Sequence, residues 1–108
     1  MPYIPTGFIN QAELANAVDQ AVLKLKLGTE VVRVRYSIGV DTSGEPSIFF
    51  RVVLSEAASR EATLADVTGN IAAVLFDEIR PYENWGLLPY FSFRSASEQA
   101  MRSEPEWA

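Results

Sequence analysis

Hydrophobic and polar residues alternate along residues 31–40, Val-Val-Arg-Val-Arg-Tyr-Ser-Ile-Gly-Val. A period of two predicts a strand with one face in the core. The inward positions are expected to be the apolar even ones: Val32, Val34, Tyr36, Ile38 and Val40. Residues 41–46 have the composition of a turn, and the alternation resumes over 47–54. The pattern therefore predicts a β-hairpin, whose second strand turns four residues inward: Ile48, Phe50, Val52 and Leu54.

Apolar residues recur at helical spacing over residues 11–27, which predicts a first helix. Asn10 is placed to cap its start, and Glu13 follows three residues later, as in a capping box. Gly28 is expected to end this helix in a left-handed conformation.

A second helix is predicted over residues 60–80, and Pro81 is expected to stop it. Gly69 lies inside this segment, where glycine costs about 1 kcal/mol relative to alanine, so we expect close packing at that position. The apolar stripe comprises Leu64, Val67, Ile71, Val74, Leu75 and Ile79.

The composition of residues 84–86, Asn-Trp-Gly, predicts a turn before a third strand over 87–94. Pro89 in this strand indicates an edge position or a strand start. Residues 95–98, Ser-Ala-Ser-Glu, form a capping box and predict a short last helix that ends before Pro105.

The predicted order is α-β-β-α-β-α. We therefore expect an α+β fold, a two-layer sandwich in which a small, mostly antiparallel sheet carries the two main helices on one face. A right-handed crossover through the second helix requires the third strand to run parallel to the second. A chain of 108 residues has the size of one domain, 1–108, with an extended arm over 1–9 and a short helix with a C-terminal tail over 95–108.

The composition excludes several kinds of chemistry. The chain has no cysteine and no histidine, so it has no disulfide, no thiolate nucleophile and no histidine ligand for a metal. It also lacks a glycine-rich phosphate loop and a recognisable nucleophile–base set, which disfavours an enzyme and predicts no cofactor. A net charge of −5 makes general DNA binding unlikely. Without a secretory signal or a long apolar run, we expect a cytoplasmic protein that does not bind membranes.

One set of residues stands out because the alternation places it on the sheet face away from the helices. Arg33, Arg35 and Arg51 occupy outward positions, and Arg35 is expected opposite or diagonal to Arg51. If Phe91 and Phe93 face the core, the third strand adds further outward residues. The candidate site for an anion or a partner is therefore Arg33, Arg35, Arg51, Arg94, Phe49 and Tyr90.

Like charges on neighbouring strands destabilise a sheet, so something negative should offset these arginines. Three sources are open: the acids Glu98, Glu104 and Glu106 of a C-terminal segment folded across the sheet, the acids of a second copy, or a ligand carrying phosphate or carboxylate. Arginines on a solvated sheet face are also ordinary, since their stems cover apolar surface.

These observations lead to a first hypothesis, a non-catalytic protein-interaction module. It would act as a homodimer or as a small accessory subunit, through the open sheet face and the terminal arms. The alternative is an anion-binding module for RNA or a phosphorylated ligand, because arginines beside aromatic rings resemble in kind the sheets that stack RNA bases. A small enzyme that uses carboxylates or Tyr90 is a third class.

Other groups of side chains give weaker signals. The acidic pairs Asp41/Glu45 and Asp77/Glu78 lack a diagnostic metal spacing and are expected to be solvated surface. An aromatic cluster under a loop is expected near the third strand, formed by Tyr82, Trp85 and Tyr90.

Overall fold

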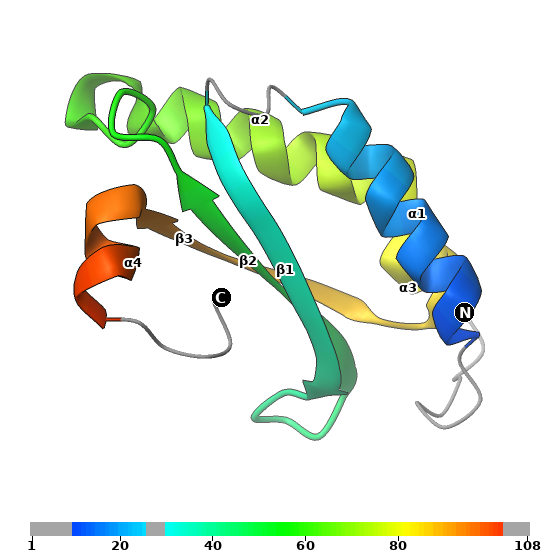
Figure 1. Cartoon of the computed structure of the whole chain (residues 1–108). Coiled ribbons are helices and arrows are strands. Elements are labelled where there is room, and N and C mark those ends of the chain that lie inside the picture. Colours follow the sequence, from blue (N-terminus) through cyan, green and yellow to red (C-terminus); the bar gives the residue numbers. More distant parts are fainter. Residues whose placement is uncertain (1–9, 26–29, 103–108) are drawn as a thin grey trace.

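A computed structural model describes residues 10–25 and 30–102 of the chain. The arm predicted over 1–9, Gly28 and the tail beyond residue 102 lie outside the described residues. The elements are α1 (Gln11–Leu23), β1 (Val31–Val40), β2 (Pro46–Leu54), α2 (Glu61–Ile79), α3 (Pro81–Trp85), β3 (Leu88–Ser95) and α4 (Ala96–Arg102). The predicted α+β order is confirmed, and the short helix α3 is an addition where a turn was expected (Figure 1).

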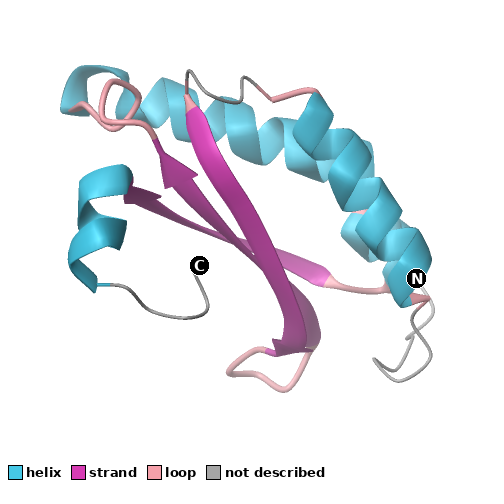
Figure 2. Ribbon diagram, in the orientation of Figure 1, coloured by secondary structure: helices cyan, strands magenta, loops and turns pink. Residues whose placement is uncertain are grey.

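The described strands form one mixed sheet in the order β1-β2-β3. β1 and β2 pair antiparallel as a hairpin, and β3 pairs parallel to β2 after the chain has passed through α2 and α3. A parallel pair needs such a crossover, because no tight turn can bring the chain back to the same end of the sheet. Figure 2 shows how the three strands twist across one another beneath the helices.

Helices α1 and α2 pack on the same face of the sheet, as predicted, and enclose the core between them and the strands (Figure 1). Phe50 on the central strand is 1% exposed, and its ring stacks on that of Phe91 with a centroid separation of 5.3 Å. The core residues that are completely buried include Leu14, Ala21, Val31, Ile48, Val52, Leu75, Ile79 and Leu87.

A β-bulge changes the face assignment at the start of β1. The register shifts between Val31 and Arg33, so two β1 residues advance while β2 advances by one, from Leu54 to Val53. Val31 is consequently buried, whereas Val32 is 50% exposed. The prediction that Val32 points into the core is wrong for this reason. The inward prediction for Val40 is also wrong, since this residue ends the strand and is 63% exposed.

The start of α1 is formed as the sequence predicts. The Asn10 side chain caps the helix by accepting a hydrogen bond from the Glu13 amide at 3.1 Å. The helix ends at Leu23, and the amide of its C-cap Lys24 donates to the carbonyl of Ala21. The regular helix is thus about one turn shorter than the predicted span 11–27.

Gly69 does not mark close packing. A Cβ atom built on it has no neighbour within 4 Å, and the residue is exposed on α2. The expectation of a tight helix contact is therefore wrong at this position. The apolar stripe of α2 is otherwise confirmed, with Val67, Ile71 and Leu75 buried, although Leu64 at its start is 37% exposed.

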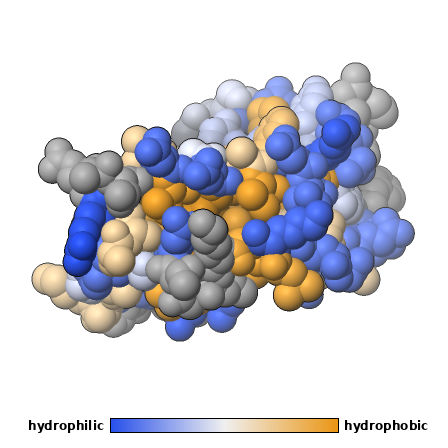
Figure 3. All heavy atoms as spheres, turned by 90° about the horizontal axis from the view of Figure 1, so that it is seen from above, coloured by the Kyte–Doolittle hydropathy of each residue, from blue (hydrophilic) through white to orange (hydrophobic). Residues whose placement is uncertain are grey.

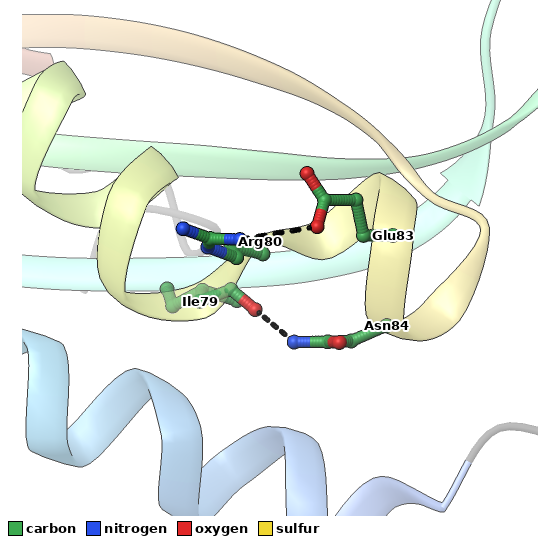
Figure 4. A network of polar contacts seen from close by, with 4 residues as sticks. All are labelled: Ile79, Arg80, Glu83 and Asn84. Carbon is green, nitrogen blue, oxygen red and sulfur yellow. Dashed lines mark hydrogen bonds and ion pairs between the residues drawn. The ribbon is translucent and has the colours of Figure 1, made fainter.

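The junction between α2 and α3 is a sharp turn of the chain (Figure 4). Arg80 adopts a left-handed conformation with φ of 48°, and its amide donates to the Phe76 carbonyl. The Asn84 side chain donates to the Ile79 carbonyl at 3.0 Å, which satisfies a carbonyl that the helix end leaves free. Pro81 begins α3 and is buried, so it both stops α2 and starts the next helix.

The predicted aromatic cluster near the third strand is not formed. Trp85 packs against the core, whereas Tyr82 is 44% exposed on α3 and Tyr90 lies on the sheet. The alternation along β3 separates these rings, because it sends Tyr90 to the face opposite the helices.

The capping box at residues 95–98 is confirmed in both directions. The Glu98 amide donates to Ser95 Oγ at 3.1 Å, and the Ser95 amide donates to Glu98 Oε1 at 3.2 Å. The Ser97 amide also donates to Glu56 Oε1 at 2.7 Å, which ties α4 to the segment after β2. Among the described residues, no helix combines the length and the apolar character needed to cross a bilayer.

Candidate functional site

The strand register places the predicted site residues on one face. Residues that pair across a sheet point to the same side, so each register row names neighbours on that side. One row joins Ser37, Phe49 and Tyr90, and the next joins Arg35, Arg51 and Ser92. A third row joins Arg33, Val53 and Arg94. We call the polar and aromatic members of these rows the arginine face: Arg33, Arg35, Ser37, Phe49, Arg51, Tyr90, Ser92 and Arg94.

Arg35 and Arg51 lie directly opposite one another in the hairpin, which is the closer of the two arrangements expected from the sequence. Arg33 and Arg94 occupy the two outer strands of the next row, about 10 Å apart at the backbone because neighbouring strands are spaced by about 4.8 Å. Four positive side chains therefore lie within two adjacent rows of a chain whose net charge is −5.

Each of these arginines is already engaged within the chain. Arg51 Nη1 donates to Ser37 Oγ at 3.0 Å, and Arg35 Nη1 donates to the carbonyl of Val34 at 3.3 Å. Arg94 Nη1 lies 3.4 Å from Oε1 of Gln99, so α4 borders this end of the face. None of the four arginines is without an interaction. A partner would therefore meet a positively charged surface whose side chains are held in place.

Three acids of the C-terminal segment were expected to neutralise the arginine face. Glu98 caps α4 through the Ser95 amide, so the hydrogen bond of its carboxylate is directed to the helix start. Glu104 and Glu106 lie outside the described residues. The expectation that the tail covers the sheet stays a prediction.

The two aromatic residues of the face form a pair. The rings of Phe49 and Tyr90 stack with centroids 5.5 Å apart and an interplanar angle of 17°. Tyr90 remains 42% exposed, and Phe49 is partly buried between the flanking strands. Stacked rings beside arginines give the face a flat apolar area next to its charge, a combination that protein interfaces use at their centres.

The tyrosine hydroxyl connects β3 to the hairpin turn. Tyr90 donates to Asp41 Oδ2 at 2.7 Å, and the other oxygen of the carboxylate accepts from Ser43 Oγ at 2.6 Å. The amides of Ser43 and Glu45 also donate to Asp41 Oδ1, at 2.9 and 3.0 Å. Asp41 therefore organises the turn and fixes the orientation of Tyr90.

These hydrogen bonds decide what the two groups can do chemically. The Ser43 side chain, with Tyr90 and the Glu45 amide, holds the pKa of Asp41 well below its ordinary value. The bond to Asp41 and partial desolvation raise the pKa of Tyr90. Asp41 is thus a poor proton acceptor, and Tyr90 stays a neutral phenol at physiological pH. Neither is suited to be the base or nucleophile of the small enzyme considered from the sequence.

Substitutions in this network should move the titration of Asp41. Ser43→Ala and Tyr90→Phe each remove a hydrogen bond to the carboxylate, so both should raise the pKa of Asp41 toward its ordinary value near ~3.9. The larger change is expected for Ser43→Ala. NMR titration of the Asp41 carboxyl carbon measures this directly, and an unchanged titration in both variants would contradict the network.

The same network determines how stability responds to acid. The folded-state pKa of Asp41 is lowered, so its contribution to stability is present above the unfolded-state value and is lost as the pH falls below about 4. Asp41→Asn should therefore flatten the acid side of the stability curve. Urea denaturation at neutral and at acidic pH measures the free energy of unfolding of the variant and of the wild type, and the loss between the two pH values should be smaller in the variant.

One member of each acidic pair considered for a metal, Glu78 and Asp41, takes part in interactions within the chain. Glu78 Oε1 forms an ion pair with Lys24 Nζ at 3.0 Å, which links α1 to α2 at the surface. Asp41 is saturated by its turn, as described above. Within residues 10–25 and 30–102, no cluster of three acidic side chains could hold a metal ion.

Protein-family models, curated proteins and solved structures were compared with the chain. None of them matches it. A function is therefore inferred from the geometry of the arginine face and its surroundings.

The helical side of the molecule has a different character. Seen from the side of α2, hydrophobic surface gathers in the middle and hydrophilic side chains border it (Figure 3). A small hollow of about 110 Å³ lies beside α1 and α2, lined half by apolar side chains and half by polar ones: Leu25, Ile71, Val74, Lys24, Glu30 and Asn70. This apolar surface is the main structural alternative to the arginine face as a contact area.

Sequence reasoning found the arginines and the two aromatic rings but missed Ser37 and the connection through Asp41. Ser37 appeared only as a polar position in an alternating strand, and its bond to Arg51 spans 14 residues of sequence. Asp41 was considered with Glu45 as a weak metal candidate and expected to be solvated surface, and its bond to Tyr90 spans 49 residues. Only the parallel placement of β3 brings Tyr90 to the hairpin, so no local signal could have revealed this contact.

Proposed function

We propose that the protein is a non-catalytic interaction module that binds an acidic surface of another polypeptide through the arginine face. The observation that carries the proposal is the direct pairing of Arg35 with Arg51 beside Arg33 and Arg94. Opposed like charges cost stability in a sheet, and a carboxylate-bearing partner would convert that cost into favourable contacts.

The aromatic pair favours a protein partner over a nucleic acid. Asp41 lies 2.7 Å from the Tyr90 hydroxyl, and its lowered pKa keeps it ionised. A fixed negative charge beside the only stacked rings of the face disfavours the phosphates that would accompany a stacked base. Arginine and tyrosine together are instead the residues that carry most energy at protein interfaces.

A second copy of the chain could neutralise the arginine face with its own acidic side chains in only one geometry. Two arginine faces placed against each other would bring like charges together. Most of the exposed acids lie on the helices, among them Glu13, Asp19, Asp66, Asp77 and Glu78, while Glu45 and Glu56 lie in loops. A homo-oligomer would therefore have to be head-to-tail, with the arginine face of one copy against an acidic surface of the next, whereas an accessory subunit beside a different acidic protein needs no such constraint.

The alternative, an anion-binding module for RNA or a phosphorylated ligand, is supported by the same four arginines and by the Phe49–Tyr90 stack. It differs from the first proposal in the identity of the bound species.

Native mass spectrometry of the protein purified gently from its own cells tests the proposal. A second polypeptide, or a whole multiple of the 12.0 kDa chain, is expected and should dissociate as salt is raised. A nucleotide or RNA mass would favour the alternative. A bare monomer under all conditions would contradict both.

A further inference from the structure

A groove runs between α1 and the outer edge of β1, with a volume of about 490 Å³. Apolar side chains line it from both elements, Val18 and Val22 on the helix and Val34 and Tyr36 on the strand. Charged side chains line it as well: Asp19 on the helix, and Arg33 and Arg35 on the strand.

The strand that borders this groove has an open edge. β1 pairs with β2 on one side, and no strand among the described residues pairs with the other side. The opposite edge of the sheet belongs to β3, which contains Pro89 and so lacks one backbone donor. β1 is therefore the edge better able to accept a further strand.

The hairpin register shows which backbone groups point outward. The Asp41 amide donates to the Glu45 carbonyl at 3.0 Å, which marks that pair as hydrogen-bonded. In an antiparallel ladder such pairs alternate with pairs whose backbone groups face away. Beyond the bulge, the amides and carbonyls of Val34, Tyr36 and Ile38 consequently face the open edge.

We infer that this edge binds an extended segment of the partner as a fourth strand, with apolar and acidic side chains in alternation. The apolar side chains of such a strand would enter the groove beside Val22, Val34 and Tyr36. The intervening side chains would lie on the arginine face, next to Arg33 and Arg35, where acids are favoured. The inference deepens the proposed function and rests on it, because the two arginines serve both.

Charge argues against a second copy as the added strand. Pairing β1 with its own copy would bring two sets of Arg33 and Arg35 onto the same face of adjoining strands. Such like-charge neighbours are destabilising, and positive residues on an edge are a known protection against self-pairing. An acidic strand reverses the sign of this interaction. The arginines would thus disfavour pairing of β1 with β1 of a second copy and select an acidic strand instead.

The inference is tested with a short synthetic peptide of alternating valine and glutamate, and a matched peptide of alternating valine and lysine. The valine–glutamate peptide should bind about tenfold more tightly, because each cross-strand charge pair contributes roughly 0.2–1 kcal/mol. Hydrogen exchange followed by NMR should show new protection at the amides of Val34, Tyr36 and Ile38. The double variant Arg33→Glu/Arg35→Glu should invert the preference between the peptides.

A matched pair of substitutions separates the groove from the charges. Val22→Lys places a charge in the apolar wall and should abolish peptide binding. Leu23→Lys, at the next residue of α1 and 71% exposed, should leave it unchanged. Amide mapping on the wild-type protein keeps the test decisive if the Val22 variant does not fold.

Three results would overturn strand addition: equal binding of both peptides, no protection of the β1 amides, or protection that arises from dimerisation without peptide. If the peptide does not bind while a native complex still depends on Arg35 and Arg51, only strand addition is wrong. If the native complex is also insensitive to those arginines, the proposed function fails as well.

Discussion

Replacing Phe50 with alanine is expected to lower the free energy of unfolding by about 3–5 kcal/mol. Phe50 is 1% exposed at the centre of β2, stacks on Phe91 and contacts the ring of Tyr36 at 6.4 Å between centroids. The substitution removes the ring that joins all three strands beneath the helices. A cavity at this position cannot collapse easily, because rigid strands border it on both sides.

Urea denaturation followed by circular dichroism measures this loss. A domain of this size has a total stability of about 5–15 kcal/mol, so the variant should be close to unfolding. Phe76→Ala is the control, since Phe76 is 46% exposed on α2 and should change stability by less than about 1 kcal/mol. Equal effects of the two substitutions would show that the core is not where the structure places it.

The double variant Arg35→Glu/Arg51→Glu is expected to weaken the native complex by more than about tenfold, or to abolish it. It replaces two central positive charges by negative ones on a face that we propose binds carboxylates. Stability should change little, because cross-strand charge pairs contribute only about 0.2–1 kcal/mol. The loss of binding can then be assigned to the surface itself, as measured by native mass spectrometry at fixed protein concentration.

Lys24→Glu/Arg60→Glu provides the matched control for this experiment. It changes the net charge by the same amount, but at exposed positions at helix ends, the C-cap of α1 and the N-cap of α2. It also breaks the surface ion pair between Lys24 and Glu78, which contributes little. If the control weakens the complex as much as the double variant, the effect is one of total charge, and the arginine face is not the binding surface.

Much of the fold follows from local patterns. The alternation over residues 31–40 and 47–54 predicted the hairpin, and its register places Arg35 opposite Arg51, which is one of the two arrangements expected. Capping residues located two helix starts, at Asn10 and at Ser95. These features were predictable because each depends on residues that are close in sequence.

The remaining features depend on contacts between distant segments. The bulge that exposes Val32 is a property of how β1 meets β2, and the apolar pair Val31-Val32 gives no local sign of which residue turns inward. The left-handed conformation of Arg80 arises from a helix junction that places Pro81 directly after it. Function, partner and ligand are still less accessible to local sequence patterns, because they depend on a surface that distant segments form together and on what binds to it.

Hydroxyl-radical footprinting of the native complex shows which surface binds the partner, because two tyrosines of matched exposure report on opposite candidate surfaces. Tyr90 on the arginine face is 42% exposed, and Tyr82 on α3 is 44% exposed. If the arginine face binds, complex formation should protect Tyr90 from oxidation, while Tyr82 and Phe76 should react as in the free protein. Protection of Tyr82 and Phe76 with an unchanged Tyr90 would contradict this expectation and assign binding to the helical side.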